Sequence, residues 1–179
     1  MKKLAFALGL AVVVAGCALT PKELPTQSGV DLNEYMGTWH EQARLPNRFQ
    51  RECVGDVQAD YALNPDGTIK VINQCRKGDG SVKQAEGLGR LAEQGPEGDT
   101  ARLEIRFAPK WTGWLPMVWG DYWIIRLADD DQYSLVGTPD RKYLWVLSRN
   151  EQADPQQVTE LLDYAGTLGF AVEDVIRRP

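Results

Sequence analysis

The chain has 179 residues, with 25 acidic against 20 basic side chains and a formal net charge of −5. This negative balance argues against a nucleic-acid partner, because phosphate binding requires a basic surface. The chain has a single histidine, His40, which excludes a metal site made of several histidines. Any Ser-His-Asp triad would have to use His40 as its base. The length suits one domain.

The first sixteen residues predict a secretory signal peptide. Lys2 and Lys3 precede an apolar and glycine-containing run that ends at Gly16 and has no acidic residue. A transmembrane helix requires about 20 consecutive apolar residues, and this run is shorter. Residues 1–16 are therefore expected to be removed on export rather than to remain as a membrane span.

A cysteine follows directly after this segment. The sequence Val14-Ala15-Gly16-Cys17 resembles the lipobox of bacterial lipoproteins, in which cleavage exposes the cysteine and its thiol and new amino group are acylated. Several acyl chains hold a protein firmly on a membrane, whereas one does so only marginally. The resemblance implies that Cys17 is a lipid anchor, and Ala18 after it implies the periplasmic face of the outer membrane. An ordinary signal peptide that happens to contain a cysteine is the alternative.

Residues 17–34 are predicted to form the acylated cysteine and a flexible tether. The segment is rich in Pro, Thr, Ser and Gly and has few apolar side chains to bury. Residues 35–179 are then expected to form the folded domain.

Short runs of alternating apolar and polar residues follow, and turn signals separate them. This pattern is typical of half-buried β-strands. Strands are predicted over residues 37–44, 54–63, 68–75, 81–92, 101–107, 120–127, 132–138 and 143–149. Short connections between so many strands favour a closed antiparallel up-and-down barrel, which removes edge strands and can enclose one small ligand. Alternation by itself leaves a β-sandwich open.

One helix is predicted after the strands. Asp154 is a suitable N-cap, Pro155 a suitable first helical residue, and Gly169 a suitable residue to end the helix. Apolar side chains recur between them at helical spacing. Strand 143–149 is apolar on both faces, so the helix is expected to cover its outer side. The predicted fold class is all-β with one C-terminal helix.

Two motifs carry a family resemblance. Residues 35–46 (YMGTWHEQARLP) are similar to the first signature of the lipocalins, and residues 137–149 (GTPDRKYLWVLSR) are similar to the second and third. The form is that of bacterial outer-membrane lipoprotein lipocalins and apolipoprotein D-like members of the family. The resemblance extends from about Asp31 to Arg178 and implies an eight-stranded antiparallel up-and-down lipocalin barrel.

The resemblance also implies which residues close the barrel. In lipocalins the tryptophan of the first signature fills the narrow end, and the arginine of the third packs across it. Trp39 and Arg149 are therefore expected to stack, with Gly37 leaving room for their close approach. When Cys17 is acylated, Cys53 and Cys75 remain and can form a disulfide in an exported protein.

Two groups of residues are candidates for ligand binding. The first is the inward-facing set of strands 101–107 and 120–127, where Arg126 is expected to face water and Trp123 therefore to face the interior. The second is the Trp-rich connection between these strands, which would be costly to expose. The predicted ligand-contacting residues are Ile105, Phe107, Trp111, Trp114, Met117, Trp119, Trp123 and Ile125. Packing of the connection onto its own domain or onto a second subunit of a homodimer is the alternative.

The predicted function is binding of a hydrophobic small molecule. A lipid-anchored lipocalin barrel implies a fatty acid or lysophospholipid, held for storage, transport or repair of envelope lipid. A lipid-modifying enzyme on the same barrel and a structural envelope lipoprotein without a ligand are the alternatives. No cofactor, metal or catalytic residue is assigned, because the acidic run 129–131 lacks the spacing of a calcium loop and His40 has no nucleophile beside it.

Overall fold

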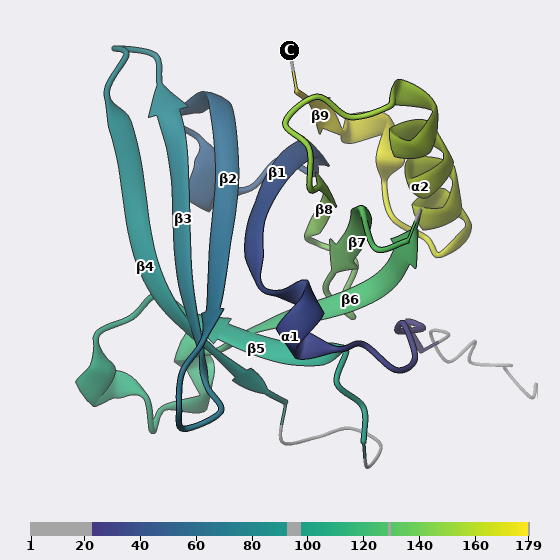
Figure 1. Ribbon diagram of the computed structural model, residues 1–179. Coiled ribbons are helices and arrows are strands. Elements are labelled where there is room, and N and C mark those ends of the chain that lie inside the picture. The colour runs from purple at the N-terminus through teal and green to yellow at the C-terminus, as the bar shows by residue number, and fades with distance from the viewer. Residues whose placement is uncertain (1–22, 93–97, 129, 179) are drawn as a thin grey trace, which may run out of the picture.

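The computed structural model describes residues 23–92, 98–128 and 130–178. Figure 1 shows a barrel with one long helix packed on its side. The strands are β1 (Gly37–Arg44), β2 (Cys53–Leu63), β3 (Ile69–Lys77), β4 (Val82–Leu91), β5 (Arg102–Arg106), β6 (Gly120–Ala128), β7 (Tyr133–Gly137), β8 (Leu144–Ser148) and β9 (Ile176–Arg177). The helices are α1 (Leu32–Tyr35) and α2 (Pro155–Thr167), with short 3₁₀ turns η1 (Arg48–Gln50), η2 (Lys110–Thr112), η3 (Pro116–Val118) and η4 (Val172–Asp174). No helix within the described ranges is both long and apolar enough to cross a membrane.

Strands β1 to β8 form a closed antiparallel barrel. Each strand pairs with the next along the chain, and β1 pairs with both β8 and β2, which closes the ring. The predicted barrel is therefore confirmed, and one continuous sheet excludes the sandwich. All eight predicted strands are present, each end within two residues of its prediction. Strand β9, which pairs with the end of β1, was not predicted because two residues are too few to show a period.

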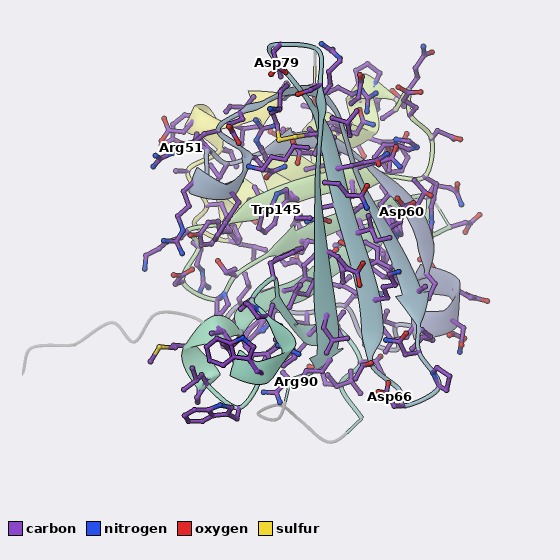
Figure 2. The ribbon with its side chains drawn as sticks, turned by 90° about the vertical axis from the view of Figure 1, so that its left-hand side faces the viewer. Arg51, Asp60, Asp66, Asp79, Arg90 and Trp145 are labelled. Carbon is purple, nitrogen blue, oxygen red and sulfur yellow. A yellow bond between two sulfur atoms is a disulfide. The ribbon has the colours of Figure 1, made fainter. Side chains whose placement is uncertain are left out.

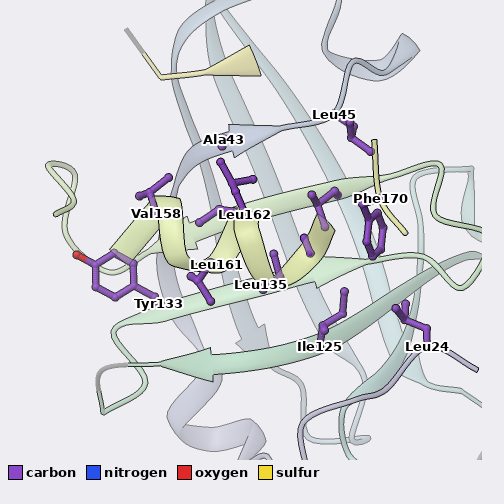
Figure 3. Packing of buried hydrophobic residues seen from close by; sticks show 13 residues of the cluster. Leu24, Ala43, Leu45, Ile125, Tyr133, Leu135, Val158, Leu161, Leu162 and Phe170 are labelled. Atoms are coloured by element: carbon purple, nitrogen blue, oxygen red, sulfur yellow. The ribbon is translucent and has the colours of Figure 1, made fainter. Parts of the chain in front are cut away.

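The sheet has an apolar core on each of its two faces. Residues directly opposite one another on neighbouring strands share a face, so the pairing assigns each side chain to the interior or the exterior. The interior core contains Tyr35, Trp39, Ala59, Tyr61, Ile69, Val71, Leu103, Tyr122, Ile124, Val136 and Leu147. The exterior core lies between the barrel and α2 and contains Ala43, Ile125, Tyr133, Leu135, Leu144, Val146, Val158, Leu161, Leu162, Ala165 and Phe170 (Figure 3).

Helix α2 covers the outer face of β7 and β8, as the apolar character of strand 143–149 predicted. It begins where expected, because the Asp154 carboxylate accepts a hydrogen bond from the backbone N–H of Gln156 at 2.9 Å. Gly169 follows the last turn with a φ of +90°, a conformation that favours glycine. Burial of the helix's apolar face against the strands is the main source of its stability.

Residues 23–34 pack against the barrel rather than forming a flexible tether. Leu24 is 1% exposed and Val30 is 5% exposed, one in the exterior core and one in the interior core. The backbone N–H of Gln27 donates to a carbonyl group of β6 at 2.9 Å. The tether prediction is therefore wrong for this stretch, because two apolar side chains suffice to hold a polar segment against an existing surface. Residues 1–22, with the predicted signal peptide and lipid anchor, lie outside the described residues.

Candidate ligand-binding site

Trp39 and Arg149 close the end of the barrel at which α1 lies. Trp39 is fully buried, and the Arg149 guanidinium lies 3.8 Å from the centroid of its ring. The same guanidinium donates to three backbone carbonyl groups in and shortly after α1. The predicted stack is therefore present. Gly37 is needed for its φ of +95° rather than for space, since a Cβ there would lie at an ordinary contact distance of 3.5 Å from Arg149.

Buried tyrosines fill the interior next to this closed end. The Tyr122 hydroxyl lies 2.9 Å from that of Tyr35 and 3.0 Å from that of Tyr61, and Tyr35 also contacts the Ser134 hydroxyl at 3.0 Å. Burial raises the pKa of Tyr35 to about 12, and it also raises the pKa values of Tyr61 and Tyr122. The phenols therefore stay neutral and hydrogen-bonded. They form a packed floor next to the closed end of the barrel.

The interior is less filled above this floor. Ile105 packs on the interior core but is only partly buried, and Phe107, at the end of β5, is 47% exposed. The Phe107 ring covers the inner face of β4, where a Cβ on Gly87 would lie 2.8 Å from it. Trp145 is also partly exposed, and it faces inward because it lies opposite Val136 of the interior core. These side chains form a partly exposed apolar surface on the inner face of the barrel, which is called the cup below.

The edge of β4 next to the cup is only partly paired. Strand β5 pairs with residues 88–91 of β4, and among the described residues no strand pairs with the same edge of residues 82–87. In Figure 2, Trp145 is seen just past this edge.

A buried ion pair lies on the inner face at the far end of β1. The side chains of Glu41 and Arg44 are 6% and 10% exposed and lie 2.5 Å apart. Arg44 lies opposite Trp145 on β8. Gln50 joins the pair to the wall, because its amide donates to Glu41 at 2.5 Å and its oxygen accepts from the Trp145 indole at 3.0 Å. Burial raises the pKa of the Glu41 carboxyl, and the positive charge of Arg44 opposes this shift.

A groove of about 420 Å³ lies beside this ion pair, between β1, β9 and the start of β2. Strand β2 pairs with β1 only along residues 37–40, whereas β9 pairs with β1 at residues 43–44. The two barrel strands therefore part at this end and leave a gap. The groove is lined by Glu41, Arg44, Pro46, Asn47, Gln50, Arg51, residues 53–57 and residues 176–178, with four arginines against two acids.

Trp123 and Ile125 were predicted to face the interior, and this prediction is wrong. Tyr122 and Ile124 belong to the interior core, whereas Ile125 belongs to the exterior core under α2 (Figure 3). The register of β6 shifts between Ile124 and Arg126. Such a bulge lets two successive side chains share a face, so an outward Arg126 does not make its neighbour point inward.

The Trp-rich connection between β5 and β6 does not line the cup. Trp111, Trp114 and Met117 are 76%, 77% and 85% exposed. The Trp119 ring packs on the barrel's outer surface, with the Arg90 guanidinium 4.1 Å from its centroid. Figure 2 shows this connection near Arg90, at the opposite end of the molecule from the turn at Asp79. These four side chains therefore do not belong to the inner face of the barrel, and their contact with a ligand stays a prediction.

Cys53 and Cys75 form the predicted disulfide, with their Cα atoms 5.5 Å apart. Cys53 lines the groove, and Cys75 is buried on β3. The bond thus fixes the start of β2 at the point where it parts from β1. Within the described residues, no three His, Cys, Asp or Glu side chains gather in a way that could hold a metal ion.

Several residues of the cup and groove were not predicted. Trp145 was placed on a strand with two apolar faces, and its alternation with Leu144 and Val146 was a usable signal for an inward position. The Glu41 and Arg44 pair had no such signal. A register shift between Glu41 and Ala43 brings the two side chains to the same face, and no period of two reveals it.

The comparison with known families agrees with this architecture. The model of the lipocalin-like domain matches residues 30–179. The chain is a lipocalin. It is 36% identical over 159 residues to temperature-induced lipocalin-1 of Arabidopsis thaliana, covering 88% of this chain and 83% of that protein. It is 33% identical over 166 residues to the outer membrane lipoprotein Blc of Citrobacter freundii, covering 92% and 88%.

Two further likenesses complete the comparison of this lipocalin. Mouse apolipoprotein D is 30% identical over 157 residues, covering 83% of this chain and 76% of that protein. The resemblance to bacterial lipoprotein and apolipoprotein D-like lipocalins is therefore confirmed. Among solved structures, insecticyanin from Manduca sexta matches with a TM-score of 0.67 and 19% identity over 88% of this chain and 84% of that one. That likeness shows the shared fold.

Proposed function

We propose that this lipocalin binds a fatty acid or lysophospholipid with its acyl chain in the open half of the barrel. The observation that carries the proposal is the division of the interior into a filled floor and a partly exposed apolar wall. Ile105, Phe107 and Trp145 expose apolar surface toward the inside, where a chain would remove it from water. Binding of such a ligand would let the protein take part in storage, transport or repair of envelope lipid.

The proposed location is the periplasmic face of the outer membrane, with Cys17 as the lipid anchor. The lipobox-like sequence before Cys17 supports this location. Proteins similar to this chain in Citrobacter freundii and Escherichia coli are named outer membrane lipoproteins. Anchorage would keep the barrel beside the source of its ligand.

The proposal is of a binding protein rather than an enzyme. Glu41 is the buried carboxyl group beside the cup, and it already pairs with Arg44 and accepts a hydrogen bond from Gln50. A general base needs a free lone pair directed at the substrate's proton. An engaged carboxylate that joins β1 to η1 is better suited to holding the cup in shape.

Affinity for fatty acids is expected to rise with chain length and then level off. Each methylene buried in the cup contributes about 0.8 kcal/mol, until the chain reaches the tyrosine floor. Titration of the delipidated protein with saturated fatty acids of increasing length, followed by tryptophan fluorescence, measures this dependence. Phe107→Ala should weaken binding, whereas the matched change Trp114→Ala, outside the cup, should not. Failure of every chain length to bind would refute the proposed function.

Replacement of Cys17 by alanine is expected to release the protein from the membrane fraction. Acylation of Cys17 is the proposed attachment to the membrane. Alanine has no thiol to acylate, so the substitution removes this attachment. Fractionation of cells that express the variant, followed by detergent partition, measures the change. Ala18→Ser serves as the control, since it keeps the cysteine. A variant that still partitions with the membrane would contradict the assignment of Cys17 as the anchor.

A further inference from the structure

Positive charge is in excess in the groove between β1, β2 and β9. Of its two acidic residues, Glu41 pairs with Arg44, and Asp56 pairs at 2.7 Å with Arg76, which lies outside the lining. Arg51 and Arg177 are exposed at the rim, and within the described ranges neither pairs with a carboxylate. The rim therefore carries two positive charges that no described acidic side chain neutralises.

Two arginines that line the groove have buried N–H groups without a partner among the described residues. Arg44 is nine-tenths buried, and its Nε has no hydrogen-bond partner in the described part of the chain. Arg178 donates through Nη2 to Glu151 at 2.5 Å, but no described residue accepts a hydrogen bond from its buried Nη1. Buried donors are nearly always satisfied in folded proteins, because leaving one unpaired is costly. An oxyanion in the groove would supply the acceptor atoms.

Residues of the groove adjoin the aromatic side of the cup. Arg44 lies opposite Trp145, and Gln50 contacts both Glu41 and the Trp145 indole. A molecule with its polar end beside Arg44 would thus have its apolar part next to Trp145. Guanidinium groups are well suited to carboxylate and phosphate oxygens, which they bind through two parallel hydrogen bonds.

We propose that this groove binds the anionic head group, a carboxylate or a phosphate, of the amphiphile whose chain occupies the cup. This inference rests on the proposed function and names the chemistry of the ligand's polar end. Arg51 and Arg177 attract the head group at the rim, and the buried N–H groups of Arg44 and Arg178 receive it. A neutral amphiphile of the same length lacks these contacts and binds more weakly.

The test compares palmitate with hexadecanol, which has the same chain and no charge. Dissociation constants are measured for the delipidated protein, for Arg51→Gln/Arg177→Gln, and for a control, Lys70→Gln/Arg126→Gln. The control removes the same charge from side chains outside the groove, since Lys70 pairs with Glu86 and Arg126 lies over the Tyr164 ring. Both pairs are surface changes that should leave folding intact, which thermal unfolding verifies.

The groove variant is expected to lose up to about tenfold in affinity for palmitate and to keep its affinity for hexadecanol. The control should bind both ligands as the unmodified protein does. Unchanged palmitate binding by the groove variant, or an equal loss for both ligands, overturns the head-group site and leaves the proposed function standing. If neither ligand binds the unmodified protein, the proposed function fails as well.

Inorganic phosphate separates a lipid head group from a free anion. If the groove receives the head group, phosphate should weaken palmitate binding to the unmodified protein and leave hexadecanol binding unchanged. If phosphate raises the melting temperature of the unmodified protein but does not compete with palmitate, the groove is a site for free anions and the head-group assignment is wrong.

Discussion

Trp39→Ala is expected to lower the free energy of unfolding by about 3–5 kcal/mol, because it empties the closed end of the barrel. The Trp39 ring is fully buried and lies 5.0 Å from the Tyr35 ring, centroid to centroid. It also supports the Arg149 guanidinium at 3.8 Å, and its indole N–H donates to the Tyr35 carbonyl. Urea unfolding followed by circular dichroism measures the loss without relying on tryptophan fluorescence.

Trp114→Ala is the matched control for this substitution. Trp114 is 77% exposed, so its truncation should change the free energy of unfolding by less than about 0.5 kcal/mol. The loss of unfolding free energy for Trp39→Phe should lie between the losses for Trp39→Ala and Trp114→Ala, because phenylalanine keeps an aromatic ring under Arg149. A loss below about 1 kcal/mol for Trp39→Ala would show that the barrel end does not depend on the stack.

Removal of the disulfide is expected to cost about 3 kcal/mol of unfolding free energy. Cys53 and Cys75 are 22 positions apart in the sequence, and their bond restricts the unfolded chain more than the folded one. The double variant Cys53→Ser/Cys75→Ser, unfolded in guanidinium chloride, measures the effect. Thiol labelling of the unmodified protein should find neither cysteine free.

Reductant provides the control for the disulfide. It should destabilise the unmodified protein by about as much as the double substitution does, and it should leave the double variant unchanged. Because Cys53 lines the groove, reduction should also lower the affinity for a charged amphiphile more than for a neutral one. Equal stability of the oxidised and reduced proteins would contradict the expected effect.

The sequence pattern determined the strands and the helix, and the family signatures implied the closed barrel. Alternation with a period of two requires only that one face of a strand is exposed to solvent and the other is buried. The residues of each strand show this difference by themselves. The Asp154 cap and the glycine at 169 are local in the same way, so the start and end of α2 were predictable. The family signatures added Trp39 and Arg149, whose stack joins residues 110 positions apart.

The tertiary structure alone decided which side chains meet in the site. The register shifts after Glu41 and after Ile124 change the facing of later residues, and they depend on hydrogen bonds to neighbouring strands rather than on the local pattern. The shift in β1 brings Arg44 to Glu41, and the shift in β6 places Arg126 on the same outer face as Ile125.

The same dependence on distant surfaces explains the other differences. Residues 23–34 have a polar composition, which predicts that they do not pack into a core. The barrel nevertheless provides an apolar surface against which Leu24 and Val30 are buried. The Trp-rich connection was expected to contact a ligand because it is apolar, but Trp111, Trp114 and Met117 are exposed and Trp119 packs on Arg90. Composition fixes how much apolar surface a segment has, and only the packed chain fixes what covers that surface.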